Sequence, residues 1–164
     1  MILKNLNKKF LINSLLVLII FLLDRISKIY VIYLDKKFLG SEIFSSKFLN
    51  ISLIWNKGIA FGLFSFNEKN LYNILTIVIL ILIIVIFYMT INSSGFKKYF
   101  LIMILGGALG NIYDRVIYKA VPDFIDLHIQ DFHWFVFNVA DIFITIGVIF
   151  MIMSEFIKKD FNKI

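Results

Sequence analysis

The segment from Leu71 to Ile91 constrains the fold of this chain more than any other stretch, because it carries no formally charged residue along its whole length. Roughly 20 apolar residues in a helix are enough to cross about 30 Å of hydrocarbon. Composition agrees, with 60% hydrophobic residues and a mean hydropathy of +0.90, values well above those of soluble domains. The sequence therefore predicts a polytopic membrane protein, and 164 residues fit a single domain.

Three further apolar segments resemble membrane helices. The predicted class is a membrane all-α fold with a small extracytoplasmic β-sheet at the outer membrane surface, in one integral-membrane domain over residues 1–164. The basic N-terminus is followed by an apolar run without a small-residue cleavage site, so we interpret it as a retained first helix. The expected helices cover about residues 10–33, 71–91, 99–115 and 137–157, and the outer segments cover about 34–70 and 116–136.

Lysine clusters predict how the chain is oriented in the membrane. They precede the first helix, join the second to the third and follow the fourth: Lys4, Lys8 and Lys9, then Lys97 and Lys98, then Lys158, Lys159 and Lys163. Basic residues concentrate in short cytoplasmic flanks, so both termini are expected in the cytoplasm. The lysines of the long first outer segment oppose this assignment and count less. The net charge of +6 is thus attributed to topology and lipid headgroups rather than nucleic acid. The absence of cysteine excludes disulfides, thiol nucleophiles and cysteine-ligated metals.

Two stretches outside the predicted helices alternate between apolar and polar residues. In Asn50–Asn56, three apolar side chains face one way, with Ile54 as the exception. This pattern is typical of a half-buried strand, and Lys57-Gly58 is expected to form the turn after it. A second alternation covers Ile125–Gln130. Together the two stretches predict a small sheet resting on the bilayer.

Four aspartates are expected in one layer near the outer membrane surface. With a rise of about 1.5 Å per residue, Asp24 lies roughly 22 Å from the inner end of its helix and Asp114 roughly 24 Å from the inner end of its own. Asp141 is near the outer start of the fourth helix, and Asp123 is in the preceding outer segment. A carboxylate that faces lipid costs several kcal/mol, so such groups normally face the bundle interior and often mark function.

Three of these four aspartates also have a structural interpretation. Asp24 could pair with Lys28 at the i,i+4 spacing, Asp114 beside Arg115 could anchor the interface, and Asp141 could be stabilised by the helix dipole. Four polar residues of the second outer segment are interpreted as solvated or headgroup residues rather than ligands: Asp126, His128, Asp131 and His133. The stretch Gly106–Gly110 is interpreted as close helix packing.

Two aspartates are preceded by an asparagine three residues earlier, Asn111 before Asp114 and Asn138 before Asp141. Two such faces on two helices predict a hydrated polar pocket. Two aspartates held close together cannot both ionise easily, so they share a proton. One can then act as general base on water while the other protonates or polarises a carbonyl. This aspartic-protease chemistry needs no cofactor and no metal. A proton-coupled transporter would use similar acids, and a non-enzymatic membrane scaffold is a third alternative.

Five blocks together resemble lipoprotein signal peptidase, also called signal peptidase II, over nearly the whole chain. They are LDRISK (Leu23–Lys28), WNKGIAFG (Trp55–Gly62), GGALGNIYDRV (Gly106–Val116), VPDFIDLH (Val121–His128) and FNVADIFITIG (Phe137–Gly147). The resemblance implies a four-helix aspartic endopeptidase of the bacterial cytoplasmic (inner) membrane, with its active site near the extracytoplasmic face. Its substrates would be prolipoproteins, cut before a diacylglyceryl-modified cysteine at the membrane lipid surface. A monomer is the expected state.

The resemblance also implies roles for individual residues. The catalytic pair falls on Asp123 and Asp141. Six other motif positions are interpreted as substrate-binding or pocket-orienting, and two more as structural: Asn56, Gly58, Asn111, Asp114, Arg115 and Asn138, then Asp24 and Lys28. The chain departs from the family pattern at Ile59, Pro122 and Phe135. Ile59 and Phe135 are expected to alter the pocket wall, and Pro122 is expected to hold Val121 in an extended conformation.

Overall fold

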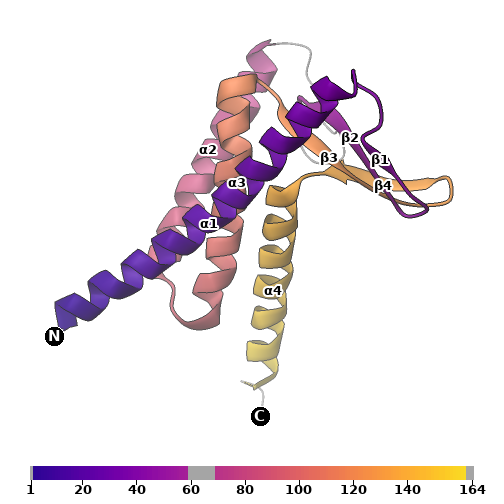
Figure 1. The fold of residues 1–164 in the computed structure, drawn as a ribbon. Coiled ribbons are helices and arrows are strands. Elements are labelled where there is room, and N and C mark those ends of the chain that lie inside the picture. Colours follow the sequence, from indigo (N-terminus) through magenta and orange to yellow (C-terminus); the bar gives the residue numbers. More distant parts are fainter. Residues whose placement is uncertain (1, 59–68, 162–164) are drawn as a thin grey trace.

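The computed structural model describes residues 2–58 and 69–161. This part of the chain forms four helices and four strands (Figure 1). The helices are α1 (Ile2–Lys37), α2 (Lys69–Asn92), α3 (Gly95–Tyr118) and α4 (Val139–Phe161). The strands are β1 (Phe44–Ser45), β2 (Leu49–Asn56), β3 (Val121–Ile129) and β4 (Phe132–Phe137).

Three of the described helices, α2, α3 and α4, are long and apolar enough to cross a membrane. The predicted first span lies within α1, which carries Asp24, Arg25 and Lys28 in its C-terminal half. Its N-terminal half exposes large apolar side chains, such as Phe10 and Leu15. The expected count of four helices is therefore observed, and the crossing of a membrane by α1 remains a prediction.

The helix ends differ from the predicted ones for local reasons. α1 begins earlier and continues to Lys37, and two left-handed residues follow it, Leu39 at φ 56° and Gly40 at φ 77°, a conformation that ends helices. α3 also starts earlier than expected and ends at Tyr118, followed by Lys119 in the left-handed conformation at φ 58°. α4 begins at Val139 rather than at residue 137, because Phe137 belongs to β4 and Asn138 caps the helix.

Helix α3 lies at the centre of the bundle, against α1, α2 and α4. Glycines allow the close approach that the Gly106–Gly110 stretch predicted. A Cβ atom at Gly106 would lie 2.8 Å from Cβ of Ile20 in α1, and one at Gly107 would lie 2.5 Å from the Ala140 carbonyl oxygen in α4. These contacts are shorter than real Cβ atoms make, so the helix backbones touch through glycine.

The strands form one antiparallel sheet in the order β1-β2-β3-β4. The sheet extends to one side of the bundle, at the end where α1 and α3 finish and α4 begins (Figure 1). Strand β2 confirms the prediction for Asn50–Asn56. The expectation that Trp55 shares the half-buried face of Ile51 is wrong, because a bulge between Ile51 and Ile54 shifts the register against β3 and leaves both Ile54 and Trp55 exposed.

Strands β3 and β4 connect the sheet to helices α3 and α4. β3 starts at Val121, as the effect of Pro122 on its neighbour predicts. β4 was not predicted, and it pairs with β3 along the hairpin that turns at Gln130 (φ 53°). Because β3 follows α3 and β4 leads directly into α4, this hairpin fixes where these two helices place their polar residues.

Candidate active site

Asn138 and Asp141 form a reciprocal cap at the start of α4. The backbone N–H of Asp141 donates to Oδ1 of Asn138 at 3.1 Å, and the backbone N–H of Asn138 donates to Oδ2 of Asp141 at 3.2 Å. This is the capping-box arrangement, in which the residue before the helix and the third residue within it satisfy each other's free N–H groups. Asp141 therefore lies in the first turn of α4, where its structural interpretation placed it, and the cap fixes this carboxylate in position.

Asp123 is held by two asparagine amides. Asn138 Nδ2 donates to Oδ1 of Asp123 at 2.6 Å, and Asn56 Nδ2 donates to Oδ2 at 2.9 Å. Asp123 is only 4% exposed. Burial, and then the charge of nearby Asp141, raise the pKa of Asp123 to about 6, while the two amide hydrogen bonds lower it. A carboxyl group with this pKa can exchange a proton near neutral pH.

Asn111 joins Asp141 to the centre of the bundle. Its Nδ2 donates to Oδ1 of Asp141 at 2.8 Å, and its Oδ1 accepts a hydrogen bond from Lys28 Nζ at 2.8 Å. Both oxygens of Asp141 thus have donors, one from the cap and one from α3. Asn138 in turn contacts both acids, so three asparagines hold the Asp123–Asp141 pair from three parts of the fold.

A buried ion cluster lies behind the asparagines. Lys28 Nζ contacts Oδ2 of Asp24 at 2.9 Å and Oδ2 of Asp114 at 2.8 Å, and all three side chains are fully buried. Arg25 Nη1 contacts Oδ1 of Asp114 at 2.6 Å. The other oxygen of Asp24 accepts the backbone N–H of Ala140 at 3.0 Å. The cluster therefore ties α1, α3 and α4 together just below the candidate catalytic pair.

Arg115 supports the site from the next turn of α3 after Asn111. It donates to the carbonyl oxygen of Gly58, and its guanidinium lies 5.8 Å from the centre of the Tyr72 ring. The Gly58 N–H donates to Oδ1 of Asn56 at 2.8 Å, so the bend after β2 orients the amide that binds Asp123. The predicted turn at Lys57-Gly58 begins here. Ile59 and the rest of its block, to Gly62, lie outside the described residues.

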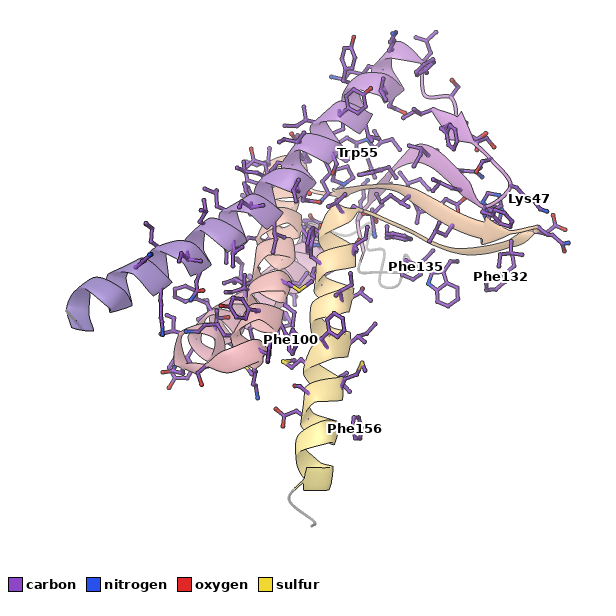
Figure 2. The ribbon with its side chains drawn as sticks, turned by 60° about the horizontal axis from the view of Figure 1, so that its bottom comes forward. Lys47, Trp55, Phe100, Phe132, Phe135 and Phe156 are labelled. Atoms are coloured by element: carbon purple, nitrogen blue, oxygen red, sulfur yellow. The ribbon has the colours of Figure 1, made fainter. Side chains whose placement is uncertain are left out.

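A mainly apolar cavity of about 560 Å³ opens beside Asp141. Its wall is built by β3, β4, α4 and Phe48, which precedes β2, and Phe132 and Phe135 lie on the same side of the β3–β4 hairpin (Figure 2). The cavity is lined by Phe48, Leu127, His128, Ile129, Phe132, Trp134, Phe135, Phe137, Asp141, Ile142, Thr145 and Ile146. Phe135 thus forms part of the wall next to a carboxylate.

The four acids expected in one layer do meet, but in two groups. Asp123 and Asp141 share the asparagines, whereas Asp24 and Asp114 belong to the ion cluster. The i,i+4 pair of Asp24 with Lys28 is confirmed. The interpretation of Asp114 as an interface anchor is wrong, because this residue is 0% exposed.

Two further features were not foreseen from the sequence. Arg25 joins the ion cluster although only its neighbours were singled out; its place inside LDRISK, between Asp24 and Lys28, was the available signal. The interpretation of Asp126 as a solvated acid is also wrong. Its position in β3 leaves it 8% exposed, and Oδ2 lies 2.8 Å from His133 Nδ1.

Solved structures show which class of protein has this architecture. A bacterial membrane enzyme determined by the in meso method superposes with a TM-score of 0.72 at 31% identity, covering 93% of this chain and 91% of the other. A second structure with a matching description gives a TM-score of 0.71 at 32% identity, covering 87% and 90%. The fold and the acidic site thus define a multi-pass bacterial membrane enzyme.

Sequence relatives then give the family. The family model described as signal peptidase (SPase) II matches residues 16–157. The lipoprotein signal peptidase of Pelagibacter ubique is 51% identical over 90% of this chain and 89% of its own, and that of Anaplasma phagocytophilum is 39% identical over 93% and 96%. The chain belongs to the signal peptidase II family of aspartic peptidases.

Proposed function

We infer from this family membership that the chain removes the signal peptides of prolipoproteins, and we propose that Asp123 and Asp141 carry out the hydrolysis. The observation that supports this pair is their shared partner: Asn138 binds Asp123 through its side chain and Asp141 through its backbone. Two carboxylates held on one residue, one of them with a pKa of about 6, have the properties that general acid–base chemistry requires.

The proposed reaction uses one water molecule and no covalent intermediate. The ionised carboxylate of the pair accepts a proton from water, whose oxygen attacks the carbonyl carbon of the scissile peptide. The protonated carboxyl group donates to the carbonyl oxygen as negative charge develops there. Collapse of the tetrahedral intermediate breaks the C–N bond, the proton taken from water passes to the departing amine, and the proton given to the carbonyl oxygen returns to the carboxylate that donated it. Because the acids are coupled, the two ionisations belong to the pair rather than to one residue.

The apolar cavity beside Asp141 supports a lipid-linked substrate. We propose that this cavity receives the lipid anchor of a diacylglyceryl-modified cysteine. The peptide bond before this cysteine then reaches the two acids. Apolar walls with few polar groups suit such an anchor, since they bury hydrocarbon and leave the polar end to fix the orientation. Phe135 and Phe137 lie on this wall, so they are expected to contact the anchor.

The remaining motif residues are proposed to orient the pair rather than to touch substrate. Asn56, Asn111 and Asn138 position the carboxylates directly. Gly58 and Arg115 act through Asn56. Three residues of the buried ion cluster set the spacing of α1, α3 and α4, namely Asp24, Lys28 and Asp114.

We propose that α1 also crosses the membrane, which gives four spans in one domain with both termini in the cytoplasm. The lysine clusters then lie on one side, and the sheet with the two acids lies at the extracytoplasmic face of the cytoplasmic (inner) membrane. Asp141 is only two residues from the start of α4 at Val139. A site at this depth would let water reach a bond that is anchored in lipid.

The test is cleavage of a purified, diacylglyceryl-modified prolipoprotein by the protein in detergent. Asp123→Asn and Asp141→Asn are each expected to lower turnover by at least about 10²-fold, the usual contribution of a general acid or base. Asp131→Asn, which changes an exposed acid of the hairpin turn, is the matched control and should keep full activity. Helical content and elution volume check that each variant is folded.

A folded Asp123→Asn or Asp141→Asn variant that still cleaves at the wild-type rate would rule out the two-aspartate mechanism. Folded wild type that leaves the lipidated precursor intact would rule out the proposed substrate. A membrane scaffold should tolerate both substitutions equally, so this comparison also separates the enzyme from that alternative.

A further inference from the structure

A second cluster of potential ligands lies on the sheet, apart from the Asp123–Asp141 pair. Asp126 and His128 are two residues apart on β3, so their side chains share a face of the strand. His133 on β4 is the direct cross-strand partner of His128. One ligand atom from each of the three residues lies within 4.8 Å of the others. The chain has two histidines, and both are in this cluster.

Two buried atoms of the cluster have no hydrogen-bond partner among the described residues, namely Oδ1 of Asp126 and Nδ1 of His128. Asp126 is 8% exposed, so its free oxygen is shielded from solvent. Buried polar atoms without partners are rare in proteins and cost free energy, and a bound ion can supply the partner that such atoms lack. His133 is half exposed, which gives an ion a route from solvent.

We propose that Asp126, His128 and His133 bind a divalent transition-metal ion of the Zn²⁺ type. Two imidazoles and one carboxylate form a donor set that suits Zn²⁺ and disfavours Mg²⁺ or Ca²⁺, which prefer oxygen ligands. An ion at this position accepts a lone pair from both orphaned atoms. Because a metal-bound imidazole nitrogen must be deprotonated, the ion replaces the proton that His133 Nδ1 and Asp126 Oδ2 share at 2.8 Å.

A purely structural role for the same residues makes a different prediction. In that case the His133–Asp126 pair and the stacking of the two histidine rings, whose centres lie 4.9 Å apart, would only stabilise the hairpin. His128 would then contribute its ring and not its nitrogen. The His128→Phe substitution separates the two roles, because it keeps an aromatic ring beside His133 and removes the ligand.

The experiment is a titration of the full-length protein, purified in detergent without a polyhistidine tag and stripped of metal with a chelator. Calorimetry with Zn²⁺ is expected to show one ion per chain. His128→Phe and His133→Phe each remove a ligand, and Asp126→Asn removes the negative charge of the third, so each should weaken binding by at least about 10-fold. Co²⁺ in place of Zn²⁺ should give the visible absorption of a tetrahedral site in the wild type and not in His128→Phe.

Two control variants locate the ion. Asp131→Asn changes an exposed acid of the same hairpin and should bind Zn²⁺ as the wild type does. Asp123→Asn should also bind normally, because Asp123 is outside the cluster. Wild type without saturable binding would overturn the proposal, as would unchanged affinity in folded His128→Phe or loss of binding in Asp123→Asn. Should Asp126→Asn fail to fold, His128→Phe still decides the outcome.

Discussion

Asn138 donates a short side-chain hydrogen bond, 2.6 Å from Nδ2 to Oδ1, to Asp123. This bond stabilises the ionised carboxylate and lowers its pKa, against burial and the charge of Asp141, which raise it. Asn138→Ala removes the donor, so the pKa of Asp123 should rise above about 6. We therefore expect the ionisation near pH 6 in the pH dependence of kcat/KM to move to higher pH.

Asn138 also caps α4, so the variant needs a control for helix stability. Asn138→Ser keeps an oxygen that can accept the Asp141 N–H but lacks the reach of the amide. It should retain the helix and still show the shifted ionisation. A wild-type pH profile in Asn138→Ser would mean that only the cap matters, and would contradict a direct effect on Asp123.

Lys28 is expected to be far more important for stability than other lysines of the chain. Lys28→Met would leave the fully buried carboxylates of Asp24 and Asp114 without their shared ammonium group. Breaking a buried ion pair in this way costs about 3–5 kcal/mol. The measurement is the free energy of unfolding in detergent, beside Lys97→Met.

The Lys97 control removes an exposed ion pair with Glu155, which is worth less than about 1 kcal/mol. A double variant tests the physical reason, because adding Asp114→Asn to Lys28→Met removes one uncompensated charge. This double variant should recover part of the lost stability. Equal effects of Lys28→Met and Lys97→Met would show that the buried cluster does not hold the bundle together.

Gly110 is expected to tolerate no side chain. A Cβ atom there would overlap with Oδ2 of Asp24, the oxygen that binds Lys28. Gly110→Ala must therefore separate α1 from α3 or displace this carboxylate, at a cost of about 1–3 kcal/mol for overpacking. Thermal unfolding compares it with Ile117→Ala, at an exposed position of the same helix. An unchanged midpoint in Gly110→Ala would contradict the close contact.

The sequence predicted those features that follow from regular geometry. The fixed rise of a helix placed Asp24, Asp114 and Asp141 at one depth, and the i,i+4 spacing paired Asp24 with Lys28. The five motif blocks also identified the family. Local periodicity and a pattern along the chain were sufficient for these features, because none of them depends on how distant segments pack.

The features that were missed depend on tertiary contacts. β4 has the sequence FHWFVF, with almost no polar alternation to mark a strand. Asp126 was interpreted as a solvated acid, yet pairing of β3 with β2 and β4 buries it. The place of Arg25 inside LDRISK marked the residue, but did not indicate that it would reach Asp114 on α3 rather than solvent. Burial and partner choice at these positions become defined only when helices and sheet assemble.

Asp123 should also make stability depend on pH. Its pKa is about 6 in the folded protein, against an ordinary value of 3.8, so the folded protein binds more protons than the unfolded chain between these values. This difference stabilises the folded state by at most about 3 kcal/mol below about pH 4. The stabilisation is lost as pH rises through about 6. Asp123→Asn lacks this ionisation.

We accordingly expect the stability difference, Asp123→Asn minus wild type, to become more positive between about pH 4 and about pH 7.5. The stability that Asp123→Asn gains over wild type at high pH will be smaller than the change in this difference with pH. The reason is that an asparagine has one acceptor oxygen for the two amides of Asn56 and Asn138. Denaturant titrations at both pH values measure the difference, and Asp131→Asn serves as the exposed control. A difference that is constant with pH would mean that Asp123 ionises as readily in the folded protein as in the unfolded chain, which would remove the electrostatic reason for assigning it an acid–base role.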